Sequence, residues 1–169
     1  LLGTSFALVH ILDALDRLGT TFRLPHGSRI MDTGGFKGRS REVSREEFFR
    51  ACKERLGVEA SFIVNEYGMT ELCSQFYDAS LGGGDPEIKI GPHWVRTLVI
   101  DPETGLEAKH GESGILRHID LANLDSVVAV ETEDLGFRKG GGFVILGRVS
   151  GAEPRGCSIS AEDFLKGKS

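Results

Sequence analysis

The residues best suited to chemistry lie in the segment 65–71, which reads Asn-Glu-Tyr-Gly-Met-Thr-Glu and follows a run of apolar residues. Tyr67 offers an aromatic face for a base, and Gly68 lets the backbone approach a ligand closely. Thr70 can donate a hydrogen bond to a phosphate, and Glu71 can hold a magnesium ion. These residue types indicate a nucleotide site. The same string also fits the polar start of a helix with Thr70 as its cap, and spacing alone does not decide between the two.

The three cysteines, Cys52, Cys73 and Cys157, are odd in number and widely spaced. They form neither a disulfide framework nor a paired zinc motif, which favours a reducing, cytoplasmic location. Cys52 falls at the core position of an expected helix and is interpreted as a small buried hydrophobe, and Cys73 is interpreted as structural. Cys157 follows Arg155, and a nearby cation lowers the pKa of a thiol and favours the reactive thiolate.

The composition and charge of the chain argue against some classes of function. The chain has 169 residues, of which 40% are hydrophobic and 27% charged, and a formal net charge of −5 without a basic block. That charge argues against a nucleic-acid partner, which would require a basic face. No apolar run reaches the roughly 18 residues of a membrane span. The sequence begins with Leu1 instead of a methionine, and its start has no basic n-region with a cleavage site. The chain is therefore expected to be part of a longer protein, and its start is not expected to be a targeting signal.

The first half of the chain must place the segment 65–71 at the end of a strand. A helix is expected over 6–18, and its apolar face reads Ile11, Leu12, Leu15 and Leu18. Residues 29–31 form a short strand that runs into a turn at 32–35. A second helix begins at the capping box of Ser44 and Glu47, ends at Leu56 before Gly57, and buries Phe48, Cys52 and Leu56. The continuous apolar run 60–64 predicts a buried strand, so that the following segment lies where ligands collect in an open α/β sheet.

The second half has a different pattern. After the glycine-rich stretch at 82–86, strands are expected at 95–100, 114–119, 127–131 and 143–146, with turns between them. The fold class is therefore α/β, with a partial parallel α/β layer followed by a small, mostly antiparallel β subdomain. The expected domains are 1–84 and 85–169.

Three short motifs occur in an order that indicates one superfamily. The string Tyr-Gly-x-Thr-Glu at 67–71 resembles the core motif of the adenylate-forming enzymes, which include acyl-CoA synthetases and peptide-synthetase adenylation domains. Residues 132–136, Thr-Glu-Asp-Leu-Gly, resemble the Thr-Gly-Asp motif, and Gly147-Arg148 resembles the Gly-Arg motif. Within this superfamily the chain resembles, over almost its whole length, the C-terminal half of the acyl-protein synthetase (LuxE-type) family. The segments that carry this resemblance are 32–38, 65–77 and 148–158, and the last contains the Arg-Gly-Cys-Ser string at 155–158.

The resemblance implies an ATP-dependent enzyme that activates a fatty acid or other carboxylic acid as acyl-AMP and transfers it to an enzyme cysteine. It implies ATP/AMP and Mg²⁺ as cofactors and an acyl reductase as a partner in the best-known members. The residue roles that it implies run along the chain. Gly34, Gly35 and Phe36 lie along the adenine, and Tyr67 stacks on the base. Asn65 and Gly68 belong to the same nucleotide-binding set, Thr70 meets the α-phosphate, and Glu71 binds magnesium. Asp134 and Arg148 take the ribose hydroxyls, and Cys157 accepts the acyl group.

The sequence also departs from the superfamily. Glu133 replaces the glycine of Thr-Gly-Asp. The usual lid domain with its lysine after Arg148, and the Ser/Thr/Gly-rich phosphate loop of the N-terminal half, are expected to be missing. The chain alone is therefore not expected to be fully active. Two alternatives stay open on the residues. One is a CoA ligase in which CoA replaces Cys157 as the acceptor, and the other is a module that binds a nucleotide without chemistry. Acyl chain length and the presence of a reductase are not given by the residues.

Overall fold

A computed structural model describes residues 1–35 and 43–149 of the chain. These residues divide into two compact units. The first comprises Leu1–Glu66 with Ser80–Gly83, and the second comprises Tyr67–Ala79 with the described part of Gly84–Pro154. The domain boundary expected after residue 84 stays a prediction. Among the described helices, none combines the length and the apolar character that crossing a membrane requires.

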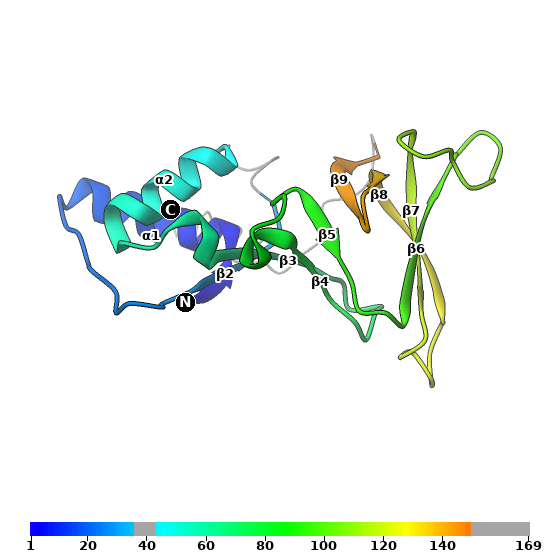
Figure 1. The fold of residues 1–169 in the computed structure, drawn as a ribbon, viewed down its shortest axis with the longest axis horizontal. Coiled ribbons are helices and arrows are strands. Elements are labelled where there is room, and N and C mark those ends of the chain that lie inside the picture. The colour runs from blue at the N-terminus through cyan, green and yellow to red at the C-terminus, as the bar shows by residue number, and fades with distance from the viewer. Residues whose placement is uncertain (36–42, 150–169) are drawn as a thin grey trace, which may run out of the picture. The chain divides into compact units, whose positions relative to one another are not determined.

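The first unit is an α/β layer (Figure 1). In chain order its elements are β1 Leu2–Thr4, α1 Ser5–Arg17, β2 Ile30–Thr33, α2 Arg45–Leu56, the 3₁₀ turn η1 Ala60–Phe62 and β3 Ile63–Tyr67. In the described part, β1, β2 and β3 pair in parallel, with Asp32 opposite Asn65 and Thr33 opposite Glu66. A second 3₁₀ turn, η2, covers Ala79–Gly82. The expected parallel α/β layer is therefore confirmed.

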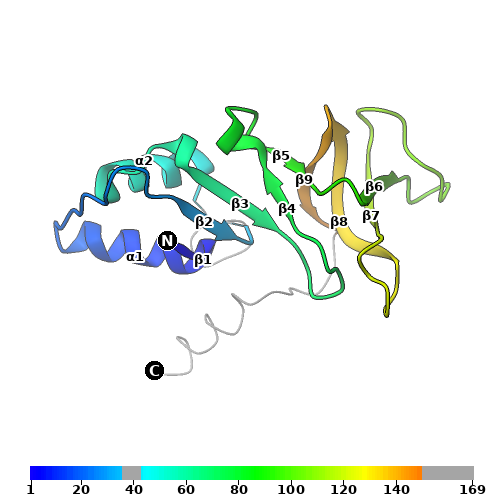
Figure 2. The ribbon, with the colours of Figure 1, turned by 60° about the horizontal axis from the view of Figure 1, so that its bottom comes forward.

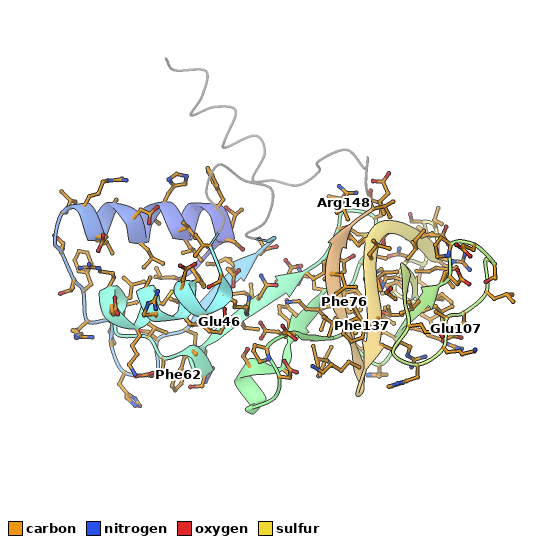
Figure 3. All side chains as sticks on the ribbon, turned by 90° about the horizontal axis from the view of Figure 1, so that it is seen from above. Glu46, Phe62, Phe76, Glu107, Phe137 and Arg148 are labelled. Atoms are coloured by element: carbon orange, nitrogen blue, oxygen red, sulfur yellow. The ribbon has the colours of Figure 1, made fainter. Side chains whose placement is uncertain are left out.

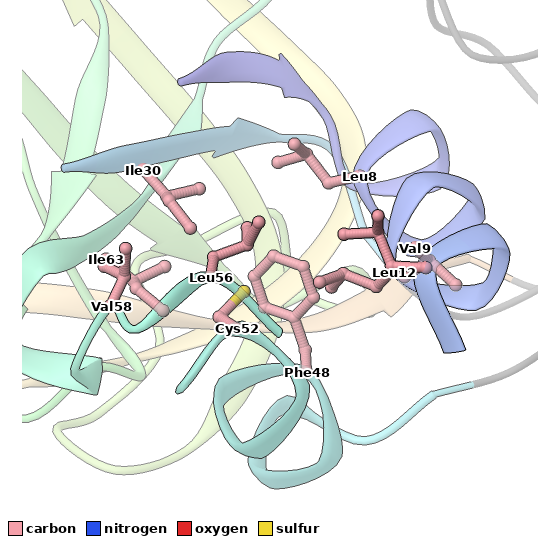
Figure 4. Packing of buried hydrophobic residues seen from close by; sticks show 10 residues of the cluster. Leu8, Val9, Leu12, Ile30, Phe48, Cys52, Leu56, Val58 and Ile63 are labelled. Atoms are coloured by element: carbon pink, nitrogen blue, oxygen red, sulfur yellow. The ribbon is translucent and has the colours of Figure 1, made fainter. Parts of the chain in front are cut away.

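The core of this unit lies between its two helices and the parallel strands. Phe48, Cys52 and Leu56 point from α2 toward Leu12 of α1 and Ile30 of β2 (Figure 4). The capping box of Ser44 and Glu47 opens α2, and Gly57 closes the helix with φ at 72°. A left-handed residue at this position is a common helix stop that glycine adopts without strain. The predicted bounds and buried face of this helix are confirmed.

Two predictions for this unit are wrong in detail. The helix α1 buries Leu8, Val9, Leu12 and Leu15. Ile11 lies on the opposite face at 51% exposed, and Leu18 follows the last helical residue. The strand expected at 60–64 begins only at Ile63, because the backbone N–H of Phe62 donates to the carbonyl of Glu59 in a 3₁₀ turn. The short strand β1 was not predicted.

The second unit consists of antiparallel strands (Figure 2). In chain order they are β4 Phe76–Asp78, β5 Ile88–Ile90, β6 Val95–Ile100, β7 Ser113–Asp120, β8 Ala129–Lys139 and β9 Gly142–Arg148. Within the described residues they lie in the spatial order β4-β5-β9-β8-β7-β6. The buried side chains of Phe76, Leu116 and Phe143 form the centre of this unit's core. The mostly antiparallel second half is confirmed, while β4 and β5 were not predicted.

One difference in this unit bears on function. The strand expected at 127–131 is β8, and it continues through Thr132–Gly136 to Lys139. Residues 132–136 fall where a turn between strands was expected, and that expectation is wrong because they lie within β8, although the register between β7 and β8 shifts beside Thr132–Asp134. Asp134 stands directly opposite Arg148 of β9 in the antiparallel register.

Candidate nucleotide-binding site

The clearest cluster of polar groups lies in the second unit, where β8 and β9 pair. The hydroxyl of Tyr67 donates to Asp134 Oδ2 at 2.7 Å, and Arg148 Nε lies 3.5 Å from Asp134 Oδ1. Asp134 and Arg148 meet because they are cross-strand neighbours, the pairs whose side chains approach each other in a sheet. Figure 3 shows Arg148 at the end of β9. The three residues that the sequence assigns to the base and the ribose are thus in contact.

Local backbone geometry shapes this cluster. The register of β8 and β9 shifts between Leu135 and Gly136, opposite Gly147. Gly147 has φ at 145°, a conformation that side chains disfavour. A bulge of this kind turns the strand end and redirects the next side chain, here Arg148. Gly147 of the Gly-Arg motif therefore has a conformational role beside the guanidinium.

Three ring side chains pack against Tyr67. Its ring packs against Phe76, His118 and Phe143, with centroids 5.8 to 5.9 Å away. Burial, followed by the neighbouring Asp134 carboxylate, raises the pKa of Tyr67 above its usual range, so the phenol stays a hydrogen-bond donor. Burial also lowers the pKa of His118 to about 4, so this ring is neutral at pH 7.

The segment after Tyr67 forms a turn in which the backbone N–H of Leu72 donates to the carbonyl of Met69 at 3.1 Å. The alternative interpretation as a helix start with Thr70 as cap is therefore wrong. Thr70 and Glu71 are both exposed, and the Thr70 hydroxyl donates to Glu71 Oε2 at 3.2 Å. These are the polar groups that the motif offers to a phosphate and a metal.

The donor set around Glu71 fits magnesium bound together with a nucleotide. In the described part of the chain, no group of three or more His, Cys, Asp or Glu side chains converges on one point. Mg²⁺ does not need such a cage, because it usually keeps several waters and binds one or two carboxylates plus substrate phosphates. A single exposed carboxylate beside a hydroxyl donor meets that requirement.

A second polar cluster surrounds the Gly34 turn in the first unit. Gly34 has φ at 87°, and the turn follows β2 directly. Its carbonyl accepts from Ser5 Oγ at 3.2 Å and from Asn65 Nδ2 at 3.0 Å. Asp32 Oδ2 accepts from the same two groups at 2.6 and 2.8 Å, and the Asp32 side chain is fully buried.

This cluster includes Asn65, whose amide nitrogen donates to the carbonyl of the Gly34 turn. Its assignment to the nucleotide stays a prediction. Ser5 and Asp32 were not predicted. The signal that could have found them is a carboxylate at the end of a buried strand, since a buried charge must be paired or hydrogen-bonded. At Gly35, beyond this turn, no described atom lies within 4 Å of the position that a Cβ would take, while Gly68, after Tyr67, is half-buried.

The cysteines differ from expectation in one case. Cys52 is a buried core residue as predicted, and burial raises the pKa of its thiol to about 12. The side chain of Cys73 is exposed, so the expectation that it fills a structural position is wrong. Phe36 and Cys157 lie outside the described residues.

The fold of the chain is similar to that of part of two solved ligases. It matches a long-chain-fatty-acid-CoA ligase from Archaeoglobus fulgidus with a TM-score of 0.65 at 18% identity, over 98% of this chain and 36% of that chain. It matches the O-succinylbenzoate coenzyme A synthetase of Bacillus subtilis, solved in complex with AMP, with a TM-score of 0.59 at 21% identity, over 88% and 31%.

The family model described as "Acyl-protein synthetase, LuxE" matches residues 1–166, so the chain belongs to this family. A curated relative is the long-chain-fatty-acid–luciferin-component ligase of Vibrio harveyi, with 25% identity over 178 residues. That match covers 99% of this chain and 46% of the relative, so the chain spans about half the length of the ligase.

Proposed function

We propose that this chain is the nucleotide-binding part of an ATP-dependent acyl-protein synthetase, which forms a fatty acyl-adenylate and transfers the acyl group to Cys157. The observation that carries the proposal is the contact of Tyr67, Asp134 and Arg148. These residues are far apart in sequence, and each falls on a motif that the superfamily uses for AMP. The expected location is the cytoplasm.

In this proposal the cluster recognises the nucleoside. Tyr67 presents its ring to the adenine, and the ring is held in place by Phe76 and Phe143 behind it. A ribose diol needs an acceptor and a donor, and Asp134 beside Arg148 supplies both. The resemblance also assigns the Gly34 turn to the adenine, and within the first unit Asn65 holds this turn.

The chemistry then has two steps. A fatty-acid carboxylate oxygen attacks the α-phosphorus of ATP, the bond to the pyrophosphate oxygen breaks, and acyl-AMP remains. Thr70 donates to the α-phosphate, and Glu71 holds the magnesium ion, which neutralises phosphate charge when bound. In the second step the Cys157 thiolate attacks the acyl carbonyl and AMP leaves. Cys157 enters this proposal from the sequence and the family.

The test mixes the chain with a synthetic fatty acyl-adenylate and measures the intact mass. We expect an addition of acyl size that hydroxylamine removes and that Cys157→Ser lacks. Cys73→Ser is the matched control, because the Cys73 thiol is exposed and could be acylated instead. An adduct that persists in Cys157→Ser, or none at all, would contradict Cys157 as the acceptor. Acylation of free CoA in its place would indicate a CoA ligase.

A further inference from the structure

The loop between β7 and β8, residues 121–128, has an inverted pattern of burial. Its apolar side chains Leu121, Leu124 and Val127 are 62%, 85% and 65% exposed, whereas Asn123 is only 1% exposed. Asparagine is seldom buried unless hydrogen bonds replace those it made with water. The loop therefore places an amide, and not a hydrophobic anchor, against the rest of the unit.

Asn123 holds the segment that follows the Thr70–Glu71 pair. Its Nδ2 donates to the carbonyl oxygen of Glu71 at 2.8 Å, and its Oδ1 accepts from the backbone N–H of Cys73 at 2.8 Å. A third bond joins Nδ2 to the carbonyl of Val127 within the loop at 3.0 Å. The amide thus binds the backbone on both sides of Leu72 and connects this segment to the loop 121–128.

A second contact joins the same two segments. Ser74 donates from Oγ to Asp120 Oδ1 at 3.0 Å, and the indole N–H of Trp94 donates to Ser74 Oγ at 2.9 Å. Ser74 and Asp120 are both buried. Figures 1 and 2 show the β3–β4 and β7–β8 loops side by side, in agreement with these bonds. The turn that carries Glu71 is therefore fixed by groups more than 45 residues away in sequence.

We propose that Asn123 is a positioning residue for phosphate and magnesium binding, acting through the backbone of Glu71. This inference rests on the proposed function and extends it to a residue in none of the three motifs. Thr70 and Glu71 are exposed and lie in a turn, so their own packing does not fix them. Binding groups gain from being held in place before the ligand arrives, and the two bonds from Asn123 supply that restraint.

The test uses Asn123→Asp, which has the same shape and keeps an acceptor for Cys73. It replaces the donor to the Glu71 carbonyl with an oxygen, so that contact becomes repulsive. We expect MgATP to bind at least about tenfold more weakly by calorimetry, while adenosine binds within about twofold of the wild type, because adenosine does not reach this turn. Leu124→Ala, an exposed change in the same loop, should alter neither affinity.

Two controls separate the possible failures. If the wild-type chain bound neither ligand, the proposed function itself would fail. If the wild type bound both and Asn123→Asp weakened both equally, or neither, only the role of Asn123 would be refuted. In Glu71→Gln, the loss of MgATP affinity caused by Asn123→Asp should shrink to less than about threefold, because the two residues act through one contact.

Should Asn123→Asp fail to fold, the wild-type chain still decides. If phosphate binding and the Asn123 contact are coupled, MgATP must stabilise the bonded form of the turn. We expect saturating MgATP to slow hydrogen exchange of the Cys73 amide by about tenfold or more relative to saturating adenosine. Equal exchange with the two ligands would overturn the proposal.

Discussion

The contact between Asp134 and Tyr67 makes one substitution especially informative. In Asp134→Asn the side chain keeps an oxygen that can accept from the Tyr67 hydroxyl, but it loses the charge. A hydrogen bond to a charged group contributes about 1.5–3 kcal/mol. Because Asp134 is 17% exposed, we take about 2 kcal/mol for the ribose contact, which corresponds to roughly 30-fold weaker AMP binding.

Stability should change much less than affinity. The bond from Tyr67 remains, and the ion pair that is lost has Arg148 at 32% exposed. Partly exposed pairs of this kind contribute up to about 1 kcal/mol, and that value bounds the loss of unfolding free energy. Asp134→Ala removes the acceptor as well. The half-buried Tyr67 hydroxyl is then left without a hydrogen bond, which should lower the unfolding free energy by a further amount of about 1–3 kcal/mol. Urea unfolding separates the two variants.

The assay is calorimetric titration with AMP and with 2′,3′-dideoxy-AMP, which lacks the ribose hydroxyls. The preference of the wild type for AMP should shrink by about 30-fold in Asp134→Asn, and the preference that remains comes from Arg148. Glu131→Gln, on the same strand and paired with Arg117, is the matched control and should leave the preference intact. An Asp134→Asn variant with an undiminished preference for AMP would refute the assignment of Asp134 to the ribose.

Three further outcomes are expected. Burial holds the pKa of His118 near 4, below its value of 6.5 in the unfolded chain. Between these two pH values the chain therefore binds a proton when it unfolds. The unfolding free energy should fall by at most about 3 kcal/mol as the pH falls from 6.5 to 4. His118→Phe should remove that slope in urea titrations at several pH values. Phe48→Ala should lower the unfolding free energy of its unit by about 3–5 kcal/mol, against less than about 1 kcal/mol for Phe22→Ala at an exposed position. Glu133→Gln should strengthen AMP binding severalfold at low salt, because it removes a carboxylate beside Arg148, and the gain should shrink as salt is added.

Local signals predicted the elements that depend on local physics. The helix α2 follows from its capping box, its buried spacing and Gly57, and all of these act within a few residues. The buried face of α1 was predicted less accurately. Apolar residues lie on more than one side of this helix, and only contact with α2 and the sheet decides which of them are buried. The exposed Ile11 is the result.

The candidate site divides in the same way. Tyr67, Asp134 and Arg148 could be found because each belongs to a short motif, although their contact depends on strand pairing. Asn123 belongs to no motif, and the segment 32–38 gave no role to Asp32. The roles of both residues arise from hydrogen bonds across long sequence separations. A buried polar residue is visible in a sequence only after its burial is known, which requires the fold.

The departure at Glu133 shows how strand geometry modifies a motif. Consecutive residues of a strand point to opposite faces, so Glu133 and Asp134 would not normally meet the same partner. Arg148 nevertheless donates from Nη2 to Glu133 Oε2 at 2.5 Å and lies against Asp134 through Nε. It can do so because both strands are irregular here: the β7–β8 register shifts beside Glu133 and Asp134, and the β8–β9 register shifts next to Gly147. The glutamate therefore adds negative charge to the site without removing the residues on which the proposed recognition depends.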